Sequence, residues 1–343
     1  MAAYLLNITL PIVTAVLLAS SCSKGLFDPD ANAASANGLA NQVVIEKLSE
    51  FNSCYDTLEF KDSFLFFTDP HIFPTPNVSP KAVSKRFSEA FSVLRNAYES
   101  LPMDFCLCGG DWLTRGDFQQ NAKEKLEYAS SRMNEWFAPY YPIFGNHDTN
   151  YHGTVSEADS SRGDLPYEYV NGVLFKDFGK AYYSFKENHT RFYILDTGID
   201  WNQSMDEYRW EQFQWLASNL ASNKDGHIAI AIHMYFASTV AENNPMVMSR
   251  ILTELCGTFN NRGAATLNGA IYDFSDAEGK VHFILAGHNH IDFQTAADGI
   301  PVVGTTKLTG DHRNSFDLCI ADYDNMVLRM FRIGDGENRI IKI

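Results

Sequence analysis

The chain contains few basic residues and few cysteines. It has 27 Lys and Arg against 42 Asp and Glu, which gives a formal net charge of −15 at pH 7. This balance argues against a basic nucleic-acid groove, although bound divalent cations can still reverse the local field for an anionic ligand. Of the six cysteines, five follow Cys22, and an odd number excludes a disulfide scaffold. Cys106 and Cys108 lie two apart on a predicted strand, which favours core packing.

The N-terminal residues resemble an export signal. Residues 2–19 are largely apolar and lead to Leu18-Ala19-Ser20-Ser21-Cys22, with no Lys or Arg ahead of the apolar run. Small residues before a cysteine resemble a bacterial lipoprotein signal, in which that cysteine is lipidated. We therefore predict that residues 1–22 send the protein to the periplasm or cell envelope. The alternatives are an ordinary cleaved signal peptide and an uncleaved anchor, although Asn7 and Pro11 make the run marginal for a spanning helix.

The remaining residues show neither an internal repeat nor a second domain. Residues 23–59 are predicted to be a tether and N-terminal segment, because 28–38 lack any apolar period. An apolar stretch at 43–51 is expected to dock on the domain. Residues 60–343 are predicted to form one domain, and a chain that is 45% hydrophobic and 20% charged has ample apolar residues for its core.

Five apolar runs in this domain end in side chains that bind metals. The runs lack polar alternation, so each is predicted to be a strand buried on both faces. Ligands in open α/β sheets collect beyond the carboxyl ends of the strands. The five ends would therefore deliver Asp, His and Asn to one crevice, which predicts a metal site. The segments are Phe64–His71, Phe105–Asp111, Ile143–Asp148, His227–His233 and His282–His290.

The segments between these runs indicate an α/β fold. Apolar residues recur at helical spacing over 87–101, and a second helix is predicted over 119–137. Strands separated by helices in this order are parallel, with the helices packed on the sheet. A hairpin is predicted at 182–195, an aromatic helix near 210–216, and antiparallel strands over 302–343. The long irregular stretch 149–165 contains Tyr151 and His152, which are candidates for substrate contact.

The polar residues at the strand ends form an ordered series of motifs. Carboxylates, imidazoles and a shared aspartate suit divalent first-row metals. The series resembles that of the calcineurin-like metallophosphoesterase superfamily over about residues 60–293, and all five motifs in order make a strong signal. The motifs are Asp69-X-His71, Gly110-Asp111, Gly145-Asn146-His147-Asp148, His233 and Gly287-His288-X-His290.

The resemblance implies a four-layer αββα sandwich of mixed sheets flanked by helices, and two divalent metal ions of Mn, Fe, Zn or Ni. By motif, the first ion would be held by Asp69, His71, Asp111 and His290, and the second by Asp111, Asn146, His233 and His288. The implied reaction is hydrolysis of a phosphoester by a hydroxide that bridges the two metals. His147 would then protonate the leaving oxygen while Asp148 orients its imidazole.

Several other polar residues are given a structural or undecided role. A lone histidine at a strand end is usually a structural residue, which we expect of His189, His227, His282 and His312. The glycines at 110, 145 and 287 are expected to let the backbone turn sharply at strand ends. Arg115 is equally well explained as a phosphate contact and as a surface residue.

Departures from known subfamilies narrow the expected substrate. Thr114 and Asp148 stand where protein Ser/Thr phosphatases carry acidic residues, and Thr114 replaces the iron-binding tyrosine of purple acid phosphatases. The remaining pattern resembles bacterial phosphoesterases related to class III cyclic-nucleotide phosphodiesterases. We therefore expect a small phosphoester substrate, with nucleotides as candidates. A phosphomonoesterase, a nuclease and an exported non-catalytic binding protein on the same scaffold remain alternatives.

Overall fold

The computed structural model of the chain describes residues 38–72, 85–114, 116–150, 163–198, 207–236, 246–309 and 314–343. The predicted export signal at 1–22 lies outside these ranges, as do Arg115, Tyr151, His152 and His312. Within the ranges, no helix combines the length and the hydropathy that a bilayer span requires.

The first sheet combines parallel and antiparallel strands in the order β14-β13-β12-β1-β2-β3. β1, β2 and β3 run parallel to one another, as the alternation of strands and helices predicted. β12 is antiparallel to both β1 and β13, and β13 is antiparallel to β14, which confirms the predicted C-terminal strands. The bounds are β1 Lys61–Phe67, β2 Phe105–Cys108, β3 Tyr140–Pro142, β12 Phe316–Asp322, β13 Val327–Ile333 and β14 Arg339–Lys342.

The second sheet has the order β10-β11-β9-β6-β5-β4. β5, β6, β9 and β11 pair in parallel, and the edge strands β4 and β10 are antiparallel. The predicted hairpin is present as β4 and β5. The bounds are β4 Tyr183–Glu187, β5 Thr190–Ile194, β6 His227–Ala231, β9 Lys280–Ala286, β10 Phe293–Ala297 and β11 Ile300–Gly304; β7 Ala264–Leu267 and β8 Ala270–Asp273 form a separate hairpin.

The two sheets face each other through aromatic side chains. Phe64 of β1 lies with its ring centroid 5.7 Å from that of Phe192 on β5, and Phe105 of β2 lies 5.1 Å from the same ring. The alternate residue Phe67 points to the other face of the sheet, where it meets Phe91 of α4. Edge-to-face pairs of this kind add to the stabilisation from burial. The apolar runs are therefore buried on both faces, as expected.

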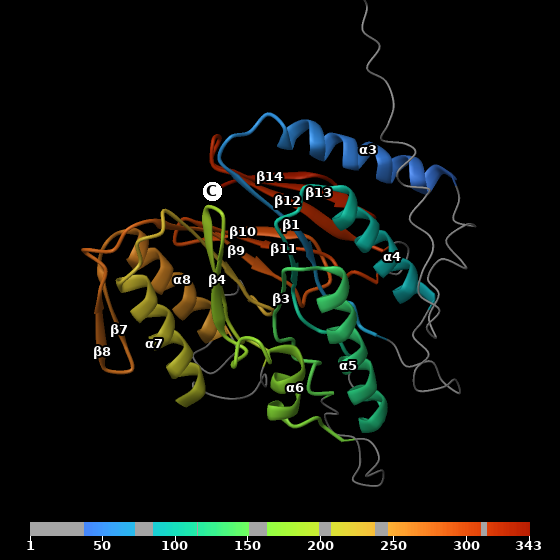
Figure 1. Ribbon diagram of the computed structural model, residues 1–343. Helices are drawn as coiled ribbons and strands as arrows, with labels where there is room; N and C mark the ends of the chain where they lie inside the picture. The colour runs from blue at the N-terminus through green and yellow to red at the C-terminus, as the bar shows by residue number, and fades with distance from the viewer. Residues whose placement is uncertain are drawn as a thin grey trace, which may run out of the picture.

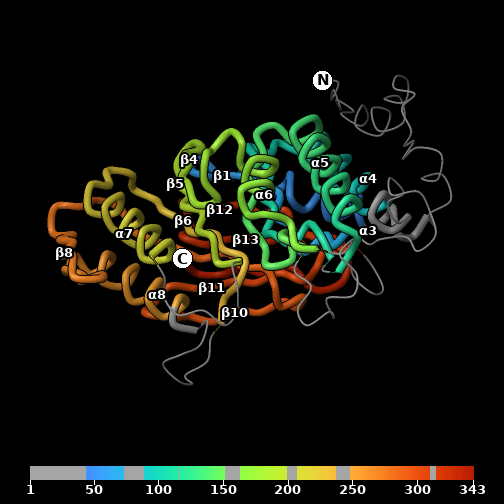
Figure 2. The backbone as a smooth tube through the Cα atoms, turned by 90° about the horizontal axis from the view of Figure 1, so that it is seen from below, coloured from blue at the N-terminus to red at the C-terminus, as the bar shows by residue number. Residues whose placement is uncertain are grey.

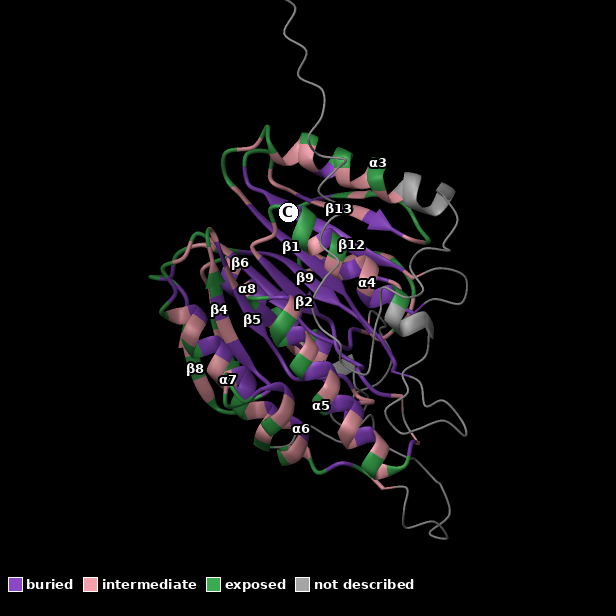
Figure 3. Ribbon diagram, turned by 45° about the vertical axis from the view of Figure 1, so that its right-hand side comes forward, coloured by how far each residue is buried: buried purple, intermediate pink, exposed green. Residues whose placement is uncertain are grey.

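Helices cover the outer face of each sheet, which completes the predicted four-layer sandwich (Figure 1). α3, α4 and α5 lie on the side of the first sheet, and α7 and α8 on the side of the second, at the far end of the molecule in Figure 2. Figure 3 shows buried strands between helices whose outward faces are exposed. The bounds are α3 Gly38–Tyr55, α4 Lys85–Ser100, α5 Gln119–Trp136, α6 Tyr167–Leu174, α7 Glu207–Ala221 and α8 Met246–Asn260.

Helix α3 occupies part of the region expected to be a tether. Residues Gly38–Tyr55 are helical, and the fully buried Phe51 packs edge-to-face on Phe331 of β13 at 5.5 Å. Docking of the apolar stretch at 43–51 is therefore confirmed. The described part of the predicted tether is therefore a helix packed on the first sheet. Its contact residue Phe331 lies almost 300 residues further along the sequence.

Candidate metal centre

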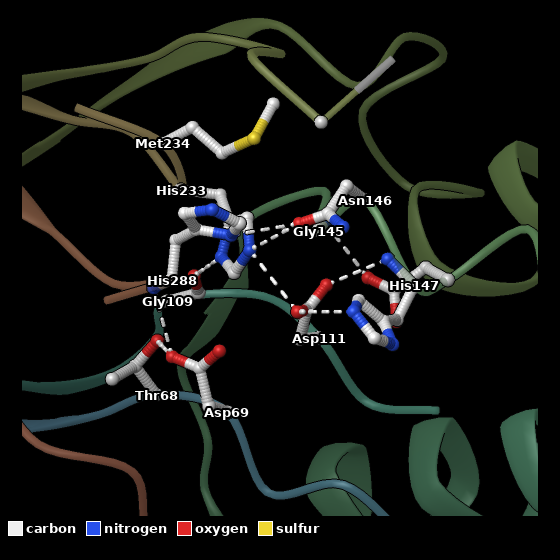
Figure 4. A network of polar contacts seen from close by, with 12 residues as sticks. Thr68, Asp69, Gly109, Asp111, Gly145, Asn146, His147, His233, Met234 and His288 are labelled. Atoms are coloured by element: carbon white, nitrogen blue, oxygen red, sulfur yellow. Dashed lines mark hydrogen bonds and ion pairs between the residues drawn. The ribbon is translucent and has the colours of Figure 1, made fainter. Parts of the chain in front are cut away.

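The proposed ligands meet at the carboxyl ends of five strands, three parallel strands of the first sheet and two parallel strands of the second. Asp69 and His71 follow β1, Asp111 follows β2, and Asn146 lies beyond β3. His233 follows β6, and His288 follows β9 (Figure 4). His290 lies two residues beyond His288. The site therefore spans both sheets, because three ligand segments come from the first sheet and two from the second.

Five of the seven proposed ligands have a left-handed backbone. This conformation is rare for residues other than glycine, and such strain persists only where the surrounding structure imposes it, often at functional sites. Here it occurs in the loops that follow β1, β2 and β9, where the ligand atoms converge. The φ angles are 51° at Asp69, 40° at His71, 58° at Asp111, 68° at His288 and 56° at His290.

Two glycines of the motifs are required for different reasons. Gly110 has φ +95°, so it makes the sharp turn that we expected of it. Gly145 instead allows a close approach, because a Cβ there would lie 2.0 Å from the Asp111 amide nitrogen. A side chain at residue 145 would push the Gly145–Asp148 segment away from Asp111.

One group of converging atoms comprises Asp69, His71, Asp111 and His290, whose potential ligand atoms all lie within 4.8 Å of one another. The Nε2 atoms of His71 and His290 are 3.0 Å apart, and His290 Nε2 is 3.1 Å from Asp69 Oδ1. Three of the four residues are buried. The set is the one expected to hold the first ion.

A second group comprises Asp111, His233 and His288 by the same measure. His233 Nε2 lies 3.3 Å from Asp111 Oδ2 and 3.1 Å from Asn146 Oδ1. His288 Nδ1 lies 2.9 Å from the same Asn146 oxygen. Asn146 is thus positioned to complete this group, which matches the set expected for the second ion.

Asp111 belongs to both groups, and its two oxygens differ. Oδ1 accepts a hydrogen bond from the His147 amide at 2.7 Å. Oδ2 is buried and accepts no hydrogen bond within the part of the chain that the structure describes. It faces His233 Nε2 at 3.3 Å and His71 Nε2 at 4.0 Å, one from each group. Imidazoles at these distances offset the charge of this buried oxygen only in part, and such incomplete pairing is costly. Two cations on either side of the oxygen would remove that cost.

The charges of the site favour cations. Burial raises the pKa of Asp111, but the imidazoles of His233, His147 and His71 lower it by more. The resulting pKa lies well below the ordinary value of an aspartate. Burial lowers the pKa of His233, whereas Asp111 raises it, to about 10. Both shifts come from the attraction between the buried carboxylate and the neighbouring imidazoles. A metal ion would take the place of the His233 proton, so metal binding and protonation compete.

Neighbouring groups orient the histidine rings. His71 Nδ1 donates to the Leu113 carbonyl at 2.9 Å, and His233 Nδ1 donates to the Gly109 carbonyl at 2.7 Å. These bonds leave both Nε2 atoms available to a metal. Thr68 Oγ1 donates to Asp69 Oδ2 at 2.6 Å. Thr68 is not among the site residues predicted from the sequence, although its place directly before Asp69 is a usable signal.

His147 and Asp148 take different positions beside the centre. Among the described residues, His147 belongs to neither metal group; its Nε2 is 3.8 Å from Asp111 Oδ2 and its side chain is 22% exposed. Asp148 is buried and accepts hydrogen bonds from the backbone amides of Trp112 at 2.6 Å and Gly145 at 2.8 Å. These contacts tie the Gly145–Asp148 segment to the loop after Asp111.

The histidines expected to be structural lie away from this edge. His227 starts β6 and His282 lies early in β9, and the two rings share a 3.0 Å contact between Nδ1 and Nε2. His189, in the turn between β4 and β5, packs its ring against Phe60 at 5.8 Å. None of the three belongs to a metal group among the described residues.

Comparisons with known proteins agree with this geometry. A family model for calcineurin-like phosphoesterases matches residues 63–292, while no curated protein matches the sequence. The structure is similar to a dimetal phosphatase from Danio rerio, at 15% identity and a TM-score of 0.53, with 82% of this chain and 98% of that chain covered.

Two further structures are similar at lower TM-scores. The anchor of the inner membrane complex of Plasmodium is 12% identical, with a TM-score of 0.44 and coverage of 83% and 90%. A putative 5'-nucleotidase from Staphylococcus aureus is 12% identical with a TM-score of 0.41, and the match covers 83% of this chain and 54% of that chain. The match of the family model over two thirds of the residues, together with the fold and the motif geometry, identifies the chain: it belongs to the calcineurin-like phosphoesterase family.

Proposed function

We propose that this metal-dependent phosphoesterase is a two-metal hydrolase of small phosphoesters. The observation that carries the proposal is the buried Asp111 Oδ2, which lies between two groups of ligands. Asp69, His71, Asp111 and His290 would hold one divalent ion, and Asp111, Asn146, His233 and His288 the other. Mn, Fe, Zn and Ni are the candidates, because the donors are oxygens and imidazole nitrogens.

When bound, the two cations would polarise the phosphoryl group and activate water as the nucleophile. The protein supplies the geometry for this chemistry. Asn146 adds a neutral ligand, which leaves more positive charge for a phosphate oxygen. His147 is partly exposed beside Asp111, so it is placed to give a proton to the leaving oxygen.

A non-catalytic binding protein on the same scaffold is the alternative. Metal content and turnover of a chromogenic phosphate ester, measured on the same purified sample, separate the two. We expect two metal equivalents per chain and hydrolysis that is lost with a chelator and restored by divalent ions. Full metal loading with no turnover of any ester would support the binding protein instead.

Among phosphoesters, we expect a preference for small diesters or nucleotides over phosphoproteins. In the motifs of protein Ser/Thr phosphatases an aspartate stands at the place of Thr114 and a glutamate at the place of Asp148. A panel of bis-p-nitrophenyl phosphate, nucleotides, cyclic nucleotides, sugar phosphates and a phosphopeptide, with Mn, Fe, Zn and Ni each supplied, measures this. Efficient hydrolysis of the phosphopeptide, with none of bis-p-nitrophenyl phosphate, would overturn the preference.

We also propose that the protein is exported and anchored through lipid on Cys22. The small residues at 19–21 precede this cysteine, and the segment after it lacks an apolar period. A single acyl chain gives only marginal membrane binding, so stable anchoring needs several chains on Cys22. Cys22→Ser should leave an unprocessed precursor, or a protein released from the membrane fraction. Cys54→Ser is the matched control, and unchanged processing and membrane association in Cys22→Ser would favour an ordinary export signal.

A further inference from the structure

A buried arginine lies in the first sheet, at the end of its strands that is nearest to the metal centre. The side chain of Arg332 on β13 is 1% exposed. Its guanidinium donates from Nε to Asp317 Oδ1 and from Nη2 to Asp317 Oδ2, both at 3.0 Å. Asp317 is directly opposite Arg332 in the β12–β13 register and opposite Phe66 in the β12–β1 register. The Arg332–Asp317 pair therefore lies beside the end of β1, because Phe66 is three residues before Asp69 in the sequence.

The same guanidinium reaches the loop that carries two proposed ligands. Arg332 Nη2 donates to Asp292 Oδ1 at 2.5 Å, and that oxygen also accepts from the Thr306 amide at 3.1 Å. Thr306 Oγ1 donates to the His290 carbonyl at 2.9 Å. A continuous chain of polar contacts thus runs from Arg332 through Asp292 and Thr306 to the backbone of His290.

Arg332 is not the only cation that pairs with the buried Asp317, so its contact with Asp292 is a second, separate role. Asp317 has a second cationic partner, because Arg339 Nη2 lies 3.0 Å from its Oδ2. Asp292 is contributed by the loop after β9, and Gly336 approaches it closely. A Cβ at Gly336, which has φ +110°, would lie 2.6 Å from Asp292 Oδ2. Arg332 therefore joins the first sheet to a ligand loop of the second sheet.

We propose that Arg332 is a positioning residue of the metal centre, which acts through Asp292 to hold His290 in place for the first ion. The proposal rests on the two-metal site described above. The neighbouring ligand His288 has a separate support, because its amide donates to Asp69 Oδ2 at 2.9 Å. Loss of the Arg332–Asp292 contact should therefore weaken the first ion more than the second.

The test is stepwise metal titration of the full chain with Mn²⁺ against a competing chelator. Asp292→Asn removes the charge on the loop but leaves the buried Asp317 paired with Arg332 and Arg339. Arg332→Met removes the contact from the other side. Removing an outer partner of a metal ligand typically costs about 10–100-fold in metal affinity. We expect a loss of up to that size for one of the two ions in both variants. Asp292→Asn also weakens the longer pairing of Asp292 Oδ1 with Arg339 at 3.8 Å, so its loss should be at least that of Arg332→Met, and the double variant should lose no more than Asp292→Asn alone.

Arg329→Met is the matched control. Arg329 pairs with the buried Asp322 at 2.8 Å on the same two strands, at the edge away from the metal centre. It should retain both affinities even if the melting temperature of the metal-free protein falls. Equal weakening of both ions, or weakening in Arg329→Met as well, would show that Arg332 only stabilises the fold. Unchanged affinities in Asp292→Asn and Arg332→Met would overturn the proposal, whereas a wild-type protein that binds no metal would overturn the proposed function instead.

Discussion

Asp111→Asn will lose both metal content and hydrolysis. The substitution replaces the charged carboxylate that faces ligands of both groups by a neutral amide, so two cations would face each other with less charge between them. Metal ions contribute several kcal/mol to stabilising the transition state, and each 1.4 kcal/mol is a factor of ten in rate. We therefore expect turnover to fall by about 10³-fold or more. Metal analysis by mass spectrometry and kcat/KM on p-nitrophenyl phosphate measure both effects.

The control for this substitution is Asp273→Asn, which makes the same change at an exposed residue of the β7–β8 hairpin. It should keep two metal equivalents and the wild-type rate. An Asp111→Asn protein that is folded, fully loaded with metal and active would show that Asp111 does not hold the two ions together.

His147→Ala will keep its metals and lose rate. His147 lies outside both metal groups among the described residues, so its removal should not release an ion. Loss of general-acid help costs about 10²–10⁴ in rate. The cost should shrink for esters of p-nitrophenol, because a good leaving group departs with little need for a proton. Rates on activated and unactivated esters, together with metal content, measure this.

The two esters also serve as internal controls for His147→Ala. If His147 is a general acid, the rate should fall strongly for an unactivated alkyl ester and only slightly for the p-nitrophenyl ester. An equal loss on both esters would assign His147 to substrate binding or charge stabilisation. A metal-free variant would instead place His147 among the ligands or their supports.

The sequence predicted the main architecture because the apolar runs and the ligand motifs follow local rules. Runs such as Phe64–Phe67 lack polar alternation, and helices between parallel strands bring their carboxyl ends to one edge. The extent of β3 was less predictable. Ile143 and Phe144 are fully buried, yet the strand ends at Pro142. An apolar run indicates that residues are buried but not that they are in a strand, and these two residues are buried in the core beyond the end of β3.

Features that depend on distant partners could not be predicted. The helical segment at 38–55 is stabilised by contact of Phe51 with Phe331, and nothing near Phe51 in the sequence indicates that partner. Arg332 meets Asp292 only because the β12–β13 pairing sets it beside the loop after β9. The position of Asp148 likewise depends on the amides of another loop. Each of these contacts joins segments far apart in the chain, where periodicity and motif spacing carry no information.

Electron paramagnetic resonance of the Mn²⁺-loaded protein tests the shared role of Asp111 most directly. Ions that share a carboxylate and lie about 3.5–4 Å apart are magnetically coupled, so the wild-type protein with two equivalents of Mn²⁺ should give the spectrum of an exchange-coupled pair. Asp111→Asn should remove that spectrum. A wild-type protein that binds a single ion, or two ions whose spectrum is that of isolated Mn²⁺, would contradict a two-metal centre built around Asp111.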